Sequence, residues 1–130
     1  MKILVAYRGT NVGQDLMDIA VKHAKAFDGR ILVMTSLIGG EATDQETIDQ
    51  AKENLEGARS FFEENGVDCE IHLLIRGMEA GEDIVSFARE KQADEIILGV
   101  KSRSKVGKLI FGSTAQVVIL SAPCPVVSVR

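Results

Sequence analysis

The sequence predicts a three-layer, doubly wound α/β fold, with a five-stranded parallel sheet in the order 3-2-1-4-5 and helices on both faces. Short apolar runs of strand length alternate with longer segments of helical periodicity from one end of the chain to the other. The chain has 130 residues, 45% of them hydrophobic, which suits one domain with a single core region. Because no linker, repeat or low-complexity segment interrupts it, we expect one domain over residues 1–130.

The first third of the chain predicts strand, helix and strand. Lys2 to Tyr7 is a continuous apolar run, which is usual for a strand buried on both faces. The next segment is helical, and Gly29 lies where a helix end needs a left-handed residue. The apolar face of that helix is formed by residues three or four positions apart, namely Leu16, Ile19, Ala20, His23, Ala24 and Phe27. Ile31 to Leu37 is the second strand.

The longest helix and a third strand follow. Thr43 and Glu46 have the spacing of a capping box, and the helix should stop at Asn65-Gly66. Its apolar stripe consists of Ile48, Ala51, Leu55, Ala58 and Phe62. Apolar and polar residues alternate from Cys69 to Leu73, which predicts a strand at a sheet edge with one exposed side.

The last part of the chain predicts two helices and two strands. A third helix is expected from about Glu79 to Lys91, and Glu95 to Leu98 forms the fourth strand. Ser113 can cap a short fourth helix, and Val126 to Val129 is the fifth strand. This alternation of strands and helices, joined by right-handed crossovers, leaves few topologies other than the order given above.

Composition excludes several classes of protein. No apolar run approaches a membrane span, and the N-terminus reads as a strand rather than a signal peptide, so we expect a cytoplasmic protein. Cys69 and Cys124 lack the spacing of metal or redox sites and are interpreted as core residues. Gly107-Lys108 is followed by Leu109, so no P-loop is present. With no Trp and one Tyr, a stacking surface for nucleic acid is disfavoured.

Charge is divided unevenly along the chain. The first 95 residues carry 19 acidic and 10 basic side chains, a net charge of −9, and the rest carry five basic side chains and no acid. Four of those five cations lie between Lys101 and Lys108. In doubly wound folds the ligand lies beyond the carboxyl ends of strands 1 and 4, where the Gly9–Gly13 and Gly99–Ser113 loops fall. Charge and topology therefore indicate the same anion site.

The residue types of the second loop suit a polyphosphate. Gly99 permits close approach of a ligand, and Gly112-Ser113-Thr114 opens a helix with free backbone N–H groups. Lys101, Ser102 and Arg103 add cations and a hydroxyl. The alternative is that Gly112 is a turn residue, Ser113 a cap and the basic run a solvated loop, and these residues alone leave both interpretations open.

The segment Ala93 to Arg130 resembles the C-terminal third of the universal stress protein family. The matching features are Gly99, the nine residues before Gly112-Ser113, and Pro125-Val126-Val127 in the last strand. The resemblance implies a Rossmann-like fold of the adenine nucleotide alpha hydrolase type that binds ATP or AMP, with magnesium as a possible companion, in a stress-response regulatory module. It also implies a homodimer through Val126 to Val129. The implied nucleotide-binding residues are Tyr7, Arg8, Gly9, Thr10, Ser36, Gly99, Lys101, Ser102, Arg103, Gly112, Ser113 and Thr114.

Three positions depart from the family pattern. Ser102 replaces the second motif glycine, Arg8 stands where nucleotide-binding members usually carry an acid, and Ser36 stands where they often have Val. The alternative hypothesis is therefore a dimeric interaction module that has lost ATP binding through Arg8 and Ser102. His23 and His72 are more typical of packing or surface roles, and no residue near the motif is an evident general base. We expect no catalytic residue and at most slow ATP hydrolysis.

Overall fold

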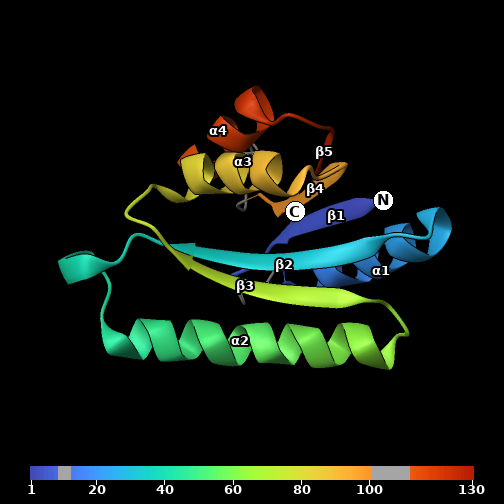
Figure 1. Cartoon of the computed structure of the whole chain (residues 1–130), viewed down its shortest axis with the longest axis horizontal. Helices are drawn as coiled ribbons and strands as arrows, with labels where there is room; N and C mark the ends of the chain where they lie inside the picture. Colours follow the sequence, from blue (N-terminus) through green and yellow to red (C-terminus); the bar gives the residue numbers. More distant parts are fainter. Residues whose placement is uncertain (9–12, 101–111) are drawn as a thin grey trace, which may run out of the picture.

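A five-stranded parallel sheet forms the centre of the molecule. The computed structural model describes residues 1–8, 13–100 and 112–130. The strands are β1 (Lys2–Ala6), β2 (Arg30–Leu37), β3 (Cys69–Ile75), β4 (Glu95–Gly99) and β5 (Val126–Val129). They lie side by side in the order β3-β2-β1-β4-β5, which confirms the predicted topology (Figure 1).

The register of the sheet brings the ends of β1 and β4 together. Ile3 lies opposite Ile31 of β2 on one side and Glu95 of β4 on the other. At the carboxyl end, Ala6 pairs with Leu98, so the segments that follow these two strands leave the same edge of the sheet. This edge is where the sequence predicts the ligand site.

Helices cover both faces of the sheet and enclose two apolar cores. One face carries α1 (Gly13–Phe27) and α2 (Gln45–Glu64), and the other carries α3 (Ala80–Lys91) and α4 (Ser113–Ser121), as Figure 1 shows. The first core includes Leu16, Leu55 and Phe62, and the second includes Leu4, Phe87 and Val118. Because β1 and β4 lie between these layers, their central residues have almost no exposed surface.

Two close backbone approaches hold helices near the site. A Cβ atom on Gly13, at the start of α1, would lie 2.8 Å from Cε1 of Tyr7. A Cβ atom on Gly81, in α3, would lie 2.8 Å from Cβ of Val117 in α4. Only glycine lets α1 approach the Tyr7 ring, and α3 approach α4, so closely at these positions.

Three predicted helix ends differ in detail from the structure. Asp44, not Thr43, caps α2 by accepting a hydrogen bond from the Thr47 backbone N–H at 2.8 Å. The left-handed residue after α1 is Asp28, with φ of 51°, and not Gly29. Ser113 is the first residue of α4 rather than its cap, because Gly112 takes the capping position.

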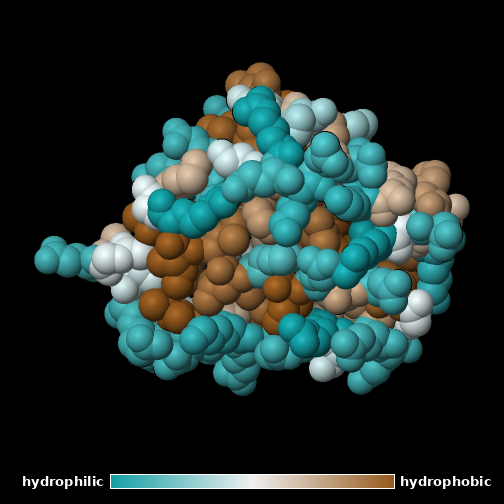
Figure 2. Space-filling model, in the orientation of Figure 1, coloured by the Kyte–Doolittle hydropathy of each residue, from teal (hydrophilic) through white to brown (hydrophobic). Residues whose placement is uncertain are grey.

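β3 is an edge strand of the sheet. β3 is half-buried along its length, as predicted for an edge, and apolar residues are visible between α2 and α3 in Figure 2. The outer face of α2 is polar in the same view. Cys69 and Cys124 are half-buried and pack against the two cores, in line with their interpretation as core residues, although neither is fully buried. Burial raises the pKa of both thiols.

Candidate nucleotide pocket

A cavity of about 690 Å³ opens at the carboxyl ends of β1 and β4. Its walls come from strand ends and from the N-terminal ends of α1, α3 and α4. The described residues that line it are Ala6, Tyr7, Arg8, Gly13, Leu16, Met34, Thr35, Ser36, Ala80, Ile84, Leu98, Gly99, Val100, Gly112, Ser113, Thr114 and Ala115. Its size is within the range usual for small-molecule sites.

Many of the predicted site residues meet in this cavity. Those that line it are Tyr7, Arg8, Ser36, Gly99, Gly112, Ser113 and Thr114. The other predicted residues lie outside the described part of the chain, and these are Gly9, Thr10, Lys101, Ser102 and Arg103. The cavity thus unites residues from β1, β2, β4 and α4 that are far apart in the sequence.

The N-terminus of α4 forms one wall of the cavity. The first intrahelical bond runs from the Gln116 N–H to the Gly112 carbonyl at 3.1 Å, so the preceding N–H groups have no acceptor within the helix. No side chain of the described residues caps this end. Ser113, Thr114 and Ala115 therefore present backbone donors, together with the positive end of the helix dipole, at the cavity wall.

Tyr7, which follows β1, lines the cavity. Its backbone N–H donates to the Met34 carbonyl at 2.9 Å, and its own carbonyl accepts a hydrogen bond from Thr35 Oγ1 at 2.5 Å. The ring packs closely against Gly13, and burial raises the pKa of the phenol. At physiological pH the Tyr7 side chain is therefore a neutral part of the cavity wall. Its backbone is hydrogen-bonded to β2, and its ring packs against the start of α1.

The floor of the cavity is formed by buried apolar residues. Met34, Ile84 and Leu98 are buried residues of the core below α3 and α4, and each also lines the cavity. Ser36, near the end of β2, and the N-terminus of α4 line the same cavity. These residues suit a ligand that combines a flat apolar group with an anion.

An ionic network centred on the buried carboxylate of Asp83 supports Ser36, and sequence reasoning missed it. Ser36 Oγ donates to Asp83 Oδ2 at 2.6 Å, and Arg76 Nε donates to Asp83 Oδ1 at 2.7 Å. Asp83 has no exposed surface. In the sequence Asp83 looks like an ordinary acid in the first turn of a helix, and only the packing of α3 on β2 brings it to Ser36, 47 residues away.

Arg8 lies between this cavity and a second one of about 350 Å³. Both cavities are lined by Arg8 and Thr35, and the second also by polar residues of α2 and its cap, including Asp44 and Asn54. Arg8 is the charged residue among the described lining of the first cavity, which contains no carboxylate within the described parts of the chain. The described parts of the chain also contain no group of three or more His, Cys, Asp or Glu side chains that could hold a metal ion.

His23 and His72 are each engaged away from the cavity. His23 Nδ1 lies 2.6 Å from Glu95 Oε1, and His72 Nε2 lies 2.9 Å from Glu70 Oε1. The His72 ring also packs against Phe87, with 5.0 Å between ring centres. Both contacts agree with the packing and surface roles expected from the sequence.

Among residues 1–8, 13–100 and 112–130, no helix has both the length and the apolar character that a membrane crossing requires.

Comparison with known proteins identifies relatives over the whole chain. The model of the universal stress protein family matches residues 1–130. A universal stress protein of Thermus aquaticus is 34% identical over 98% of this chain and 97% of its own. A solved universal stress protein of Archaeoglobus fulgidus has a TM-score of 0.91 and 38% identity, covering 99% of this chain and 97% of its own.

A second solved structure carries a ligand. The universal stress protein of Archaeoglobus fulgidus in complex with dAMP has a TM-score of 0.85 and 33% identity, covering 99% of this chain and 96% of its own. The fold, the sequence motif and these matches agree, and the chain belongs to the universal stress protein family.

Proposed function

We propose that this protein binds an adenine nucleotide, ATP or AMP, in the cavity at the ends of β1 and β4 and acts as a nucleotide-linked regulatory module in stress response. The observation that carries the proposal is the N-terminus of α4, which no side chain of the described residues caps and which opens into a large cavity with an apolar floor. A helix N-terminus attracts phosphate, and an apolar floor suits a purine.

The described residues suggest a position for each part of the nucleotide. Backbone N–H groups of Ser113 and Thr114 would hold a phosphate, and Met34 and Ile84 would contact the base. A relative with 33% identity over nearly the whole chain was solved with dAMP, which supports a nucleotide of this class here. Lys101 and Arg103, predicted to add charge, lie outside the described residues.

The competing hypothesis, an interaction module that has lost nucleotide binding, depends on Arg8 and Ser102. Arg8 does line the cavity, but it also borders the second one, so it need not fill the first. A guanidinium in the wall of the cavity favours phosphate oxygens. We therefore interpret Arg8 as a phosphate contact, and the variant Arg8→Asp tests this directly.

Magnesium binding and ATP hydrolysis have less support from the described cavity lining than nucleotide binding has. Because no carboxylate lines the described part of the cavity, a magnesium ion would be held mainly by nucleotide phosphates and water. Tyr7 is a neutral phenol and the described lining holds no His, Asp or Glu that could act as a base for water. Any ATP hydrolysis should therefore be slow.

Dimerisation is proposed through the outer edge of β5, the last strand of the sheet in the described part of the chain. Val126 and Val127 are half-buried at this edge, and Leu120 of α4 is 84% exposed. Pairing of β5 with its copy across a two-fold axis would cover the strand edge. We propose a cytoplasmic homodimer, and a monomer mass by solution scattering at micromolar concentration would contradict it.

Calorimetry with AMP, ADP and ATP, each with and without magnesium, tests nucleotide binding. The variant Ser113→Glu places a negative charge at the first turn of α4 without removing helix propensity. It should weaken AMP binding by about tenfold or more through repulsion of the phosphate. Arg8→Asp should also weaken binding, whereas the lost-binding hypothesis expects it to strengthen binding.

Ser60→Glu is the matched control, because Ser60 is an exposed residue of α2 outside the cavity. It should leave AMP binding unchanged. The proposed function fails if the unaltered protein shows no heat of binding and no thermal stabilisation with any adenine nucleotide at millimolar concentration.

A further inference from the structure

The guanidinium of Arg8 is not neutralised within the part of the chain that the structure describes. Arg8 is exposed, and it is the only charged residue in the described lining of the cavity of about 690 Å³. It forms no hydrogen bond or ion pair with another described residue. A guanidinium has several N–H donors and no acceptor, so a ligand group that meets it there is favoured when it is an anion.

The cavity therefore has two features that attract anions. One is the N-terminus of α4, where Ser113 and Thr114 have backbone N–H groups without an acceptor in the helix. The other is Arg8, which comes two residues after the end of β1. They belong to different elements of the wall, and a ligand with one phosphate has only one dianionic group to share between them.

Arg8 also borders space that α4 does not reach. It lines the second cavity, of about 350 Å³, together with residues of α2 such as Gln50 and Asn54. α2 packs into the core on one face of the sheet, and α4 packs into the core on the other face (Figure 1). Arg8 and the α4 N-terminus are thus separate anion contacts, and a ligand with two separate anionic groups can use both.

Carboxylates beyond Arg8 restrict where the second anion can lie. The second cavity is lined by Asp44 and Glu46. Hydrogen bonds from Thr47 lower the pKa of Asp44, so this carboxylate is ionised at neutral pH. An anion inside the second cavity would be repelled by these charges, whereas the described lining of the first cavity holds no carboxylate. An anion bound to Arg8 therefore stays on the side of the first cavity.

We infer that Arg8 binds a second phosphate carried by the ribose, so that the preferred ligand is an adenosine phosphorylated at the 5′ position and also at the 2′ or 3′ position. The inference rests on the nucleotide binding proposed above. In that arrangement Met34 of β2 contacts the base, and α4, which follows β4, holds the 5′-phosphate. The ribose joins these two groups. β1 lies between β2 and β4, so Arg8, which follows β1, is placed beside the ribose.

Arginine chemistry favours a phosphate over a free hydroxyl at this position. A guanidinium can donate two parallel hydrogen bonds to a phosphate, and both are strengthened by charge. A neutral hydroxyl offers it a single acceptor without charge. In dinucleotide-binding α/β folds an acid accepts the ribose hydroxyl, whereas an arginine accommodates a ribose phosphate. Arg8 supplies the second kind of contact.

The decisive comparison uses isomers. ADP and adenosine 3′,5′-bisphosphate contain the same atoms and differ only in where the second phosphate is attached. Calorimetry without magnesium, at one fixed ionic strength, measures their dissociation constants together with those of adenosine 2′,5′-bisphosphate, AMP and ATP. At least one ribose bisphosphate should bind about tenfold more tightly than ADP, the value of one charge-assisted contact. ATP controls for total charge, because its extra phosphates all lie on the 5′ chain, and it should not match that affinity.

The variant Arg8→Gln removes the charge and keeps a long polar side chain. It should reduce the advantage of the bisphosphate over ADP to about twofold or less, while AMP, which lacks the second phosphate, weakens by about threefold or less. Arg8→Lys should keep part of the advantage. Because Arg8 has no partner among the described residues, thermal unfolding should show nearly the same Tm for both variants.

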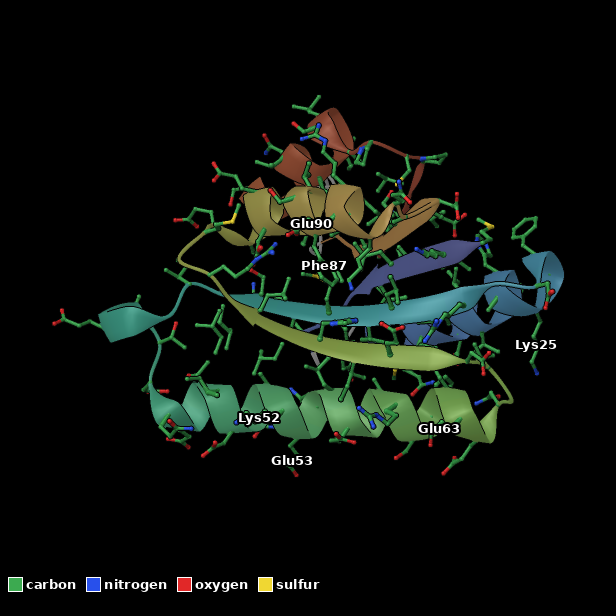
Figure 3. All side chains as sticks on the ribbon, viewed as in Figure 1. Lys25, Lys52, Glu53, Glu63, Phe87 and Glu90 are labelled. Atoms are coloured by element: carbon green, nitrogen blue, oxygen red, sulfur yellow. The ribbon has the colours of Figure 1, made fainter. Side chains whose placement is uncertain are left out.

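Lys25→Gln is the matched control, since it removes the same charge elsewhere. Lys25 is an exposed residue in the last turn of α1, labelled in Figure 3, and it is in the described lining of neither cavity. This variant should keep the affinity ratio of the unaltered protein. A ratio that falls as much in Lys25→Gln as in Arg8→Gln would show a general charge effect and overturn the inference.

The remaining failures are distinguishable from one another. If ADP binds the unaltered protein as tightly as both bisphosphates do, the inference is overturned and the proposed function stands. If Arg8→Gln weakens ADP and the bisphosphates equally, Arg8 contacts the 5′ chain, and the inference is again wrong. An advantage that persists in Arg8→Gln assigns the ribose phosphate to another group and also overturns it. If no adenine nucleotide binds, the proposed function fails and the inference fails with it.

Discussion

The close packing of α3 on α4 predicts opposite effects for one substitution at two glycines. Gly81 lies near the start of α3, where an added Cβ would be 2.8 Å from Val117 Cβ and 3.3 Å from the Thr114 carbonyl oxygen. Gly57 lies in the middle of α2, and a Cβ there would have nothing within 4 Å. Gly81→Ala and Gly57→Ala thus differ in the space available to one methyl group.

The expected magnitudes follow from helix propensity and packing. Alanine in place of glycine inside a helix contributes about 0.5–1 kcal/mol, so Gly57→Ala should stabilise the protein by that amount. At Gly81 the gain is smaller because the residue lies in the first turn. Val117 Cβ is attached directly to the backbone and cannot turn aside, so α3 and α4 must separate, at a cost of about 1–3 kcal/mol. Gly81→Ala should therefore destabilise the protein by roughly 1–2 kcal/mol.

Thermal and urea unfolding, followed by circular dichroism, measure the difference. For a domain of this size 1 kcal/mol corresponds to about 3–5 °C in Tm, so the two variants should move Tm in opposite directions. Because Thr114 lines the cavity in which we propose that nucleotide binds, Gly81→Ala should also weaken AMP binding, whereas Gly57→Ala should not. Equal stabilisation by both substitutions would refute the close contact between α3 and α4.

Three further predictions concern the core, the Arg76–Asp83 ion pair and the Cys69 thiol. Phe62→Ala should lower the free energy of unfolding by about 3–5 kcal/mol, because the ring has no exposed surface, and urea unfolding measures it. Arg76→Leu should lower the free energy of unfolding by about 2 kcal/mol in the same assay, because it leaves the Asp83 carboxylate buried beside Ser36 without its guanidinium. A decrease of less than about 0.5 kcal/mol would contradict the pairing. Burial raises the pKa of Cys69 to about 11, so iodoacetamide should alkylate it far more slowly at pH 8 than it does in the unfolded chain. Because the folded pKa is the higher one, Cys69 stabilises the fold below pH 9 and loses that contribution between pH 9 and 11, and Cys69→Ala should remove this part of the pH dependence.

The strands could be predicted from the sequence because burial on both faces leaves a direct signal. Runs such as Ile31 to Leu37 match the observed strands to within a residue, and the alternation after Cys69 correctly placed β3 at an edge. Helix ends were harder, because neighbouring residues offer the same chemistry. Thr43 and Asp44 can both cap a helix, and the choice depends on the path of the chain leaving β2, which no local pattern specifies.

The location of the cavity could be predicted from topology, but its chemistry could not. Gly112, Ser113 and Thr114 are marked by their motif and do line the cavity. Arg76 and Asp83 carry no motif, and their meeting with Ser36 depends on the packing of α3 against β2. Long-range pairs of this kind become visible only when side chains are placed in three dimensions.

The cavity lies where the two apolar cores come within reach of one ligand. Leu16 belongs to the core under α1 and α2, Leu98 belongs to the core under α3 and α4, and both line the cavity. Elsewhere the sheet separates these cores. Anything bound there contacts both layers, so amide hydrogens in α1 and α4 should become slower to exchange together when nucleotide is added. Binding of a ligand would thus make the two layers of the domain open and unfold more cooperatively.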